Sequence, residues 1–99
     1  MNGLAHLLRP TFSYVITSGA TSIVGARTTP IGVVALRINA TADVWVSIGP
    51  NPTATATGSM LIQGGDPAEI IKANAGDQVA VLLVATTGTG TVSVTEMSR

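Results

Sequence analysis

The chain has 99 residues, enough for one small domain with a single hydrophobic core. Five Lys or Arg residues balance five Asp or Glu residues, and charged residues make up 10% of the chain, against about 25% in an average soluble domain. This composition excludes a nucleic-acid binder that neutralises phosphates with clustered cations, and the 45% hydrophobic fraction excludes a disordered chain.

A sparsely charged, neutral surface makes a lone monomer poorly soluble, so we expect partners to cover much of it. The sequence has no cysteine, which removes disulfides, thiolate metal ligands and a cysteine nucleophile. The first ten residues lack the basic and apolar regions of a secretory signal. The longest apolar run, 79–85, is far shorter than the ~20 residues of a membrane-spanning helix. These features predict a protein made in the cytoplasm of its host, with neither membrane nor nucleic acid as a partner.

Residues 1–10 are predicted to form a short N-terminal arm. Leu4, Leu7 and Leu8 have the i, i+3, i+4 spacing of a helix face, and Pro10 ends any helix before Phe12. A segment this short does not hold a helix by itself. Two interpretations stay open: a lightly packed terminus, or an arm whose leucines contact a neighbouring subunit.

From residue 11 onward the sequence is rich in residues branched at Cβ, which favour strands. Apolar runs alternate with Gly, Pro, Asn and Asp clusters; 78–85 is apolar on both faces and is expected to be central, and 53–57 (TATAT) is expected to be an exposed loop. The predicted strands are 11–17, 21–26, 32–40, 43–48, 59–63, 68–73, 78–85 and 91–96. Their regular spacing predicts an all-β fold, a single antiparallel β-sandwich or jelly-roll-like domain over residues 11–99.

The sequence offers little catalytic chemistry. His6 is the single histidine and lies in the predicted arm, so neither a histidine-based metal centre nor a Ser-His pair is expected. The acidic residues lie mostly beside turns or near the C-terminus, where such groups bond local amides or face solvent; they are Asp43, Asp66, Glu69, Asp77 and Glu96. We therefore predict that the protein is not an enzyme and has no catalytic, metal-binding or cofactor-binding residues and no cofactor.

Trp45 is the single tryptophan and lies in the middle of strand 43–48, on the face opposite Val44 and Val46. Packing in the core or against a subunit is favoured over sugar stacking, since sugar-binding modules use several aromatic platforms and this chain has one Trp, one Tyr and one Phe. The candidate contacts with neighbouring subunits or partners are therefore Leu4, Leu7, Leu8 and Trp45.

About two thirds of the chain resembles a family of small β-rich virion proteins of tailed bacteriophages. The matching segments are 36–42 (LRINATA), 44–49 (VWVSIG), 52–55 (PTAT), 65–71 (GDPAEII), 75–81 (AGDQVAV) and 90–97 (GTVSVTEM). Trp45 stands where the family pattern has another aromatic or a smaller residue, so its role is not carried over. The first thirty residues match no known pattern.

This resemblance implies a capsid decoration (cement) protein, or else a tail or fibre component. The leading hypothesis is a non-enzymatic structural protein that binds the outer capsid shell and stabilises it by bridging capsid subunits, as a trimer. Its partners are then the major capsid protein and further copies of itself, and its location is the outer capsid surface of the virion. The alternative is a tail- or fibre-associated module that binds a receptor or glycan, with a pocket near Trp45 or the loop 64–67.

Overall fold

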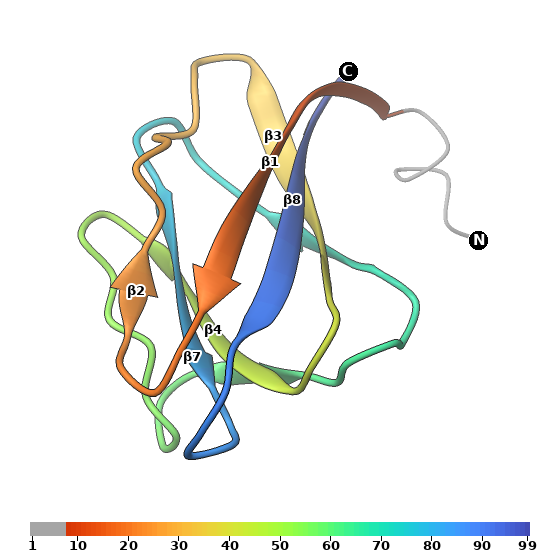
Figure 1. The fold of residues 1–99 in the computed structure, drawn as a ribbon. Coiled ribbons are helices and arrows are strands. Elements are labelled where there is room, and N and C mark those ends of the chain that lie inside the picture. Colours follow the sequence, from red (N-terminus) through yellow and green to blue (C-terminus); the bar gives the residue numbers. More distant parts are fainter. Residues whose placement is uncertain (1–7) are drawn as a thin grey trace.

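The computed structural model describes residues 8–99, which form two packed four-stranded antiparallel sheets (Figure 1). One sheet, called sheet A, has the strand order β1-β8-β3-β6, and the other, sheet B, has the order β2-β7-β4-β5. The strands are β1 (Arg9–Ser18), β2 (Ile23–Val24), β3 (Val33–Ala40), β4 (Val44–Gly49), β5 (Met60–Ile62), β6 (Glu69–Lys72), β7 (Gln78–Leu83) and β8 (Gly90–Ser98). The prediction of a small all-β sandwich is confirmed.

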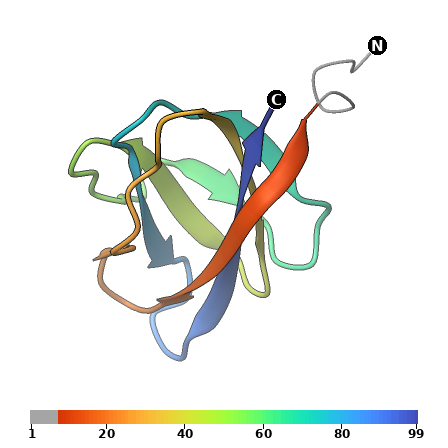
Figure 2. The same cartoon turned by 90° about the horizontal axis from the view of Figure 1, so that it is seen from above.

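The two inner faces form one core, as the period of two in the strand sequences predicts. Side chains that alternate along β3, β4, β7 and β8 are almost completely buried; they include Leu36, Ile38, Val44, Val46, Val79, Val81, Val92 and Val94. The run predicted to be a central strand is β7, which lies between β2 and β4. Figure 2, seen from above, shows the sheets as two layers around this core.

Several strand boundaries differ from the sequence prediction by one or two residues, among them those of β1 and β2. Strand β1 begins at Arg9 rather than at residue 11, so Pro10 belongs to the sheet and pairs with Met97. Proline is tolerated there because β1 is an edge strand and the register shifts between Pro10 and Phe12. Strand β2 is confined to Ile23–Val24, and the chain after it stays hydrogen-bonded to the start of β7 through Gly25 and Thr29.

The loop between β4 and β5 contains the TATAT segment, and part of it is buried. Pro52 is buried and Ala54 is 3% exposed, whereas Thr53, Thr55 and the residues after them are exposed. The Ala54 N–H donates to Ser22 Oγ at 2.9 Å, next to the edge strand β2. The expectation of a fully exposed loop was wrong at Ala54, because this loop returns to the β2 side of the sandwich.

Candidate interaction surfaces

A row of large apolar side chains crosses the outer face of sheet B. Trp45 of β4 lies directly opposite Leu61 of β5 on one side and Leu82 of β7 on the other. Because residues opposite one another share a face, the three side chains form a continuous row, here called the Trp45 row. Trp45 and Leu82 are half-buried and Leu61 is 43% exposed. The sequence prediction that Trp45 lies opposite the core face of β4 is confirmed.

The strands of the sheet that carries the Trp45 row are uncharged. The strands of sheet B, with sequences IV, VWVSIG, MLI and QVAVLL, contain no Asp, Glu, Lys or Arg. Val24 of β2, which the register places on the same outer face, is 39% exposed. An apolar patch on an otherwise soluble domain is typical of a surface that binds another molecule.

The outer face of sheet A has a different chemistry. On β1 and β8 it carries a ladder of hydroxyl groups, Ser13, Thr17, Thr91, Ser93 and Thr95, which the register places side by side. The hydroxyls of Ser13 and Thr95 are hydrogen-bonded at 2.9 Å. Val15 stands among them with 61% of its surface exposed. On β1 and β8 this face is polar without being charged, whereas the exposed Arg37 of β3 lies opposite Thr95 and adds a cation beside the ladder.

A buried ion pair closes one end of the sandwich. Glu96 points inward from β8 between Leu36 and Phe12 on the neighbouring strands, and it is 1% exposed. Arg27 reaches it with two parallel bonds: Nε donates to Oε2 at 2.8 Å and Nη2 donates to Oε1 at 2.8 Å. The Phe12 ring lies against the same guanidinium, 4.2 Å from Arg27 Cζ to the ring centroid. The hydrogen bond to Glu96 raises the pKa of Arg27 above its ordinary value.

Arg27 is positioned by the backbone on both sides of it. The Gly25 N–H donates to the Val79 carbonyl at 2.8 Å, and the Thr29 N–H donates to the Asp77 carbonyl at 2.8 Å. These bonds tie the segment after β2 to the beginning of β7, so the guanidinium faces the end of sheet A. Sequence reasoning placed Glu96 near a terminus and missed this partner.

Tyr14 lies beside the ion pair on the inner side of β1, and its pKa is raised to about 12, chiefly by burial and then by the nearby Glu96 carboxylate. The folded state therefore holds the phenol proton at a pH where the unfolded chain releases it. We expect stability to be unaffected below pH 10 and to fall as the pH rises from 10 towards 12.

Chemical unfolding across this pH range measures the effect, and phenolate absorbance reports the proton directly because Tyr14 is the single tyrosine. The variant Tyr14→Phe is the control. If its stability falls with pH as steeply as that of the wild type, another group is responsible.

The other residues that the sequence analysis singled out are the N-terminal leucines, His6 and the acidic residues. Leu8 is 7% exposed and packs against Ala35 and Met97 of its own chain, while Leu4, Leu7 and His6 lie outside the described residues. Two of the acidic residues hold turns, as predicted. Asp43 Oδ1 accepts from the Gly64 N–H at 2.8 Å, and Asp77 Oδ2 accepts from the Asn74 N–H at 2.9 Å.

The other two acidic residues line a shallow pocket of about 370 Å³ at the edge of sheet B. Its lining residues are Leu61, Ile62, Gln63, Asp66, Pro67 and Glu69. Leu61 also belongs to the Trp45 row, so the apolar row and the acidic pocket are continuous. Within residues 8–99, no three His, Cys, Asp or Glu side chains come together as a metal site.

Comparison with known proteins leaves the surfaces as the guide to function. No family model, no curated protein and no solved structure matches this chain. The part of the chain that the structure describes contains no helix long and apolar enough to cross a membrane. The fold is a small β-sandwich, and the strands of its sheet B present an uncharged outer face suited to contact.

Proposed function

We propose that this chain is a non-enzymatic structural protein of a tailed-bacteriophage virion, where it binds the outer capsid shell and stabilises it by bridging capsid subunits, as a trimer. The observation that carries the proposal is the charge-free outer face of sheet B with the Trp45 row across it. The resemblance of six segments to small virion proteins of tailed phages supplies the partner, the major capsid protein.

The chemistry of the surface suits permanent assembly better than capture of a small ligand. Interface cores are rich in aromatic residues and poor in charge, with Trp among the commonest residues that dominate binding energy. The Trp45 row has this composition, and its hydrophobic contacts are insensitive to salt. A face of this kind left bare invites aggregation at zero net charge, so a partner that covers it also keeps the protein soluble.

Bridging of capsid subunits is possible because each copy offers one face to the capsid and a second face to other copies. A trimer presents three copies of the Trp45 row, and simultaneous contact with several capsid subunits converts weak single contacts into strong avidity. The hydroxyl ladder on sheet A stays available for contacts between copies or with solvent. Such reinforcement requires no catalytic group.

The proposal is tested with phage particles assembled with and without this chain. We expect particles that lack it to release their DNA at a lower temperature or at lower salt, because fewer contacts then resist the internal pressure of the packaged genome. If the chain acts by binding, adding the purified chain back to these particles restores their stability. Equal heat stability of both kinds of particle contradicts the reinforcing role.

A second candidate function is favoured by the acidic pocket. Asp66, Glu69 and Gln63 offer acceptors and an amide for sugar hydroxyls, and Leu61 offers an apolar wall. On this hypothesis the protein is a receptor- or glycan-binding module of a tail or fibre. The double variant Asp66→Asn, Glu69→Gln then abolishes host attachment while particle heat stability is unchanged, and the decoration hypothesis predicts normal attachment.

A further inference from the structure

Strand β1 is the longest strand of the domain and lies at the edge of sheet A; within residues 8–99 it pairs with β8 on one side and with no strand on the other. A free strand edge presents unpaired N–H and C=O groups to any extended chain that comes beside it. The strands at the other sheet edges are much shorter; they are β6 (Glu69–Lys72), β5 (Met60–Ile62) and β2 (Ile23–Val24). The edge of β1 is therefore the main place where a further strand can be added to this fold.

The hydrogen bonds of β8 show which backbone groups of β1 face the free edge. The Thr41 N–H, just beyond β3, donates to the Thr91 carbonyl at 3.0 Å, and the Thr91 N–H donates to Thr41 Oγ1 at 2.9 Å. Backbone groups of successive residues point to opposite sides of a strand, so the residues of β8 that bond towards β1 are those on either side of Thr91 and every second one after them. They are Gly90, Val92, Val94 and Glu96, which pair with Ser18, Ile16, Tyr14 and Phe12. The residues between these on β1 point their N–H and C=O groups to the free edge; they are Ser13, Val15 and Thr17.

The outward-facing residues of β1 are symmetric about Val15. If β1 pairs antiparallel with β1 of a second copy and the pairing is centred on Val15, Ser13 lies opposite Thr17, and Val15 lies opposite Val15. Each such pair exchanges two N–H···O bonds, so this register satisfies the outward groups of all these residues. Val15 is also the centre of residues 12–18, the regular part of β1 after the register shift that follows Pro10. Pro10, which has no N–H to donate, lies outside the paired stretch.

The side chains along this edge suit the same register. On the outer face, Val15 is 61% exposed and gains an apolar neighbour, while the hydroxyl groups of Ser13 and Thr17 come opposite one another. On the inner face, the half-buried Tyr14 comes opposite Ile16 of the second copy. Pairing therefore covers apolar surface in addition to satisfying backbone groups.

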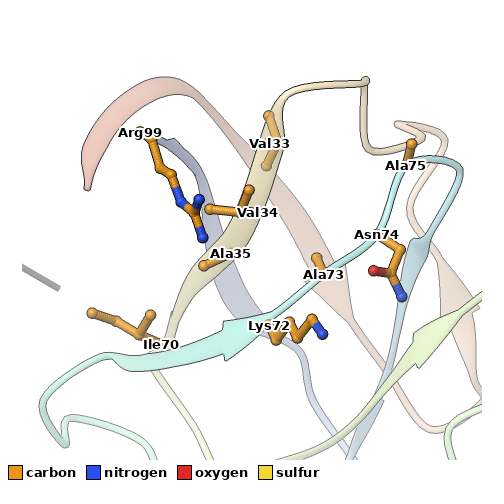
Figure 3. Close-up of a pocket in the computed structure, with 9 residues that line it drawn as sticks. All are labelled: Val33, Val34, Ala35, Ile70, Lys72, Ala73, Asn74, Ala75 and Arg99. Atoms are coloured by element: carbon orange, nitrogen blue, oxygen red, sulfur yellow. The ribbon is translucent and has the colours of Figure 1, made fainter. Parts of the chain in front are cut away.

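Charge distinguishes the edge of β1 from the opposite edge of sheet A. Strand edges that resist pairing usually carry Lys or other charges. Residues 10–18 of β1 contain none, and the net charge of the chain is zero, so no repulsion opposes a second copy. Strand β6, by contrast, has Glu69 and Lys72 within four residues, and Figure 3 shows Lys72 and Arg99 on the walls of one groove beside this edge. A second copy is therefore expected to pair through β1 and not through β6.

We propose that two copies of this chain associate across a two-fold axis by antiparallel pairing of β1 with β1, centred on Val15. The pairing joins the two four-stranded A sheets into one continuous sheet. A two-fold contact closes at two copies, so within the proposed decoration layer it links copies of neighbouring trimers and does not form the trimer itself. The outer face of sheet B takes no part in it and stays available to a different partner.

Sedimentation and hydrogen exchange of the free chain test the proposal. As the concentration rises, we expect the mass of the sedimenting species to double and the exchange of the Ser13, Val15 and Thr17 amides to slow. The amides of Tyr14 and Ile16 bond to β8 in either state and should be protected at every concentration. An unchanged mass up to millimolar concentration overturns the proposal, and so does a doubling that leaves exchange at Ser13, Val15 and Thr17 as fast as before.

A single charge at the axis gives a sharper test. Val15→Lys places two ammonium groups directly opposite one another, so this variant is expected to weaken association by about tenfold or more. Val15→Thr is the matched control: it keeps the branched Cβ, adds no charge and should associate as the wild type does. Val15 is exposed on the outer face, so both variants should fold, which circular dichroism verifies. Equal association of the two variants overturns the proposal.

A pair of charges tests the register separately. In the double variant Ser13→Lys, Thr17→Glu, opposite charges face one another in both outer pairs, whereas in Ser13→Lys, Thr17→Lys like charges do. We expect the first to associate at least as strongly as the wild type and the second about tenfold more weakly or worse. If the two double variants associate equally, the axis does not lie at Val15 and the proposal is wrong. All these measurements use the free chain, so they are independent of whether it binds a capsid.

Discussion

Replacing Arg27 with methionine is expected to lower the free energy of unfolding at neutral pH by more than Glu96→Leu does, because the variant leaves the Glu96 carboxylate buried and unpaired. Glu96 is 1% exposed and takes both of its strong hydrogen bonds from this one guanidinium. The loss is smaller than for a fully buried pair, since the side chain of Arg27 is 38% exposed and water enters where it is removed.

Urea unfolding of Arg27→Met, Glu96→Leu and the double variant measures this as a double-mutant cycle. We expect Arg27→Met to be the least stable of the three, and the double variant to regain much of the loss, because an apolar pair of similar size leaves no buried charge. Equal stability of Arg27→Met and the wild type contradicts the view that this pair closes the end of the sandwich.

The strands were predictable from sequence because each carries its own local signal. Val44 and Val46, or Val92 and Val94, recur at every second position, and Gly and Pro clusters separate the runs. All eight predicted strand positions correspond to strands of the structure. The partition into sheets was beyond this reasoning, since it depends on pairings such as that of β1 with β8, which are distant in the chain.

The alternation of residues in β8 predicts the position of Glu96 in the ion pair but not the identity of its partner, Arg27. Glu96 follows Val92 and Val94 at the same spacing of two, which places an acidic side chain on the inner face and calls for a cationic partner. The identity of that partner was hidden, because Arg27 lies in an irregular segment with no periodicity. Its position is set by backbone bonds to β7, a contact between residues about fifty positions apart.

The contact of Leu8 with its own chain was hidden from the sequence for a related reason. The spacing of Leu4, Leu7 and Leu8 indicates a helix face, but strand β1 begins at Arg9 and Leu8 packs on Ala35 and Met97. A seven-residue pattern has no weight against tertiary contacts that bury an apolar side chain. Trp45, by contrast, was placed correctly, because a strand of clear alternation determines which face each residue occupies.

The outer faces of the two sheets offer different kinds of contact to an assembly. The hydroxyl ladder of sheet A can hydrogen-bond to water, so leaving it exposed costs little free energy. Covering the apolar Trp45 row, by contrast, removes apolar surface from water and is favourable. A neighbouring molecule is therefore expected to cover the outer face of sheet B before that of sheet A. A variant there should affect assembly much more than an equally exposed variant on sheet A.

Replacing Trp45 with alanine is the strongest test of this expectation. The central aromatic residue of an apolar interface contributes about 2 kcal/mol or more to binding, so Trp45→Ala is expected to weaken binding to capsid shells by about 30-fold or more. The inner residues Val44 and Val46 are untouched by the change, and the domain should stay folded. Co-sedimentation with shells that lack the protein measures binding, and circular dichroism monitors the fold.

Val15→Ala is the matched control, because Val15 is a 61% exposed apolar residue on the opposite sheet. It should bind shells as the wild type does. If Trp45→Ala also binds normally, the Trp45 row is not the docking surface and the proposed bridging loses its physical basis. If instead particles carrying Trp45→Ala keep their heat stability but fail to attach to host cells, the row belongs to a receptor-binding site continuous with the Asp66–Glu69 pocket.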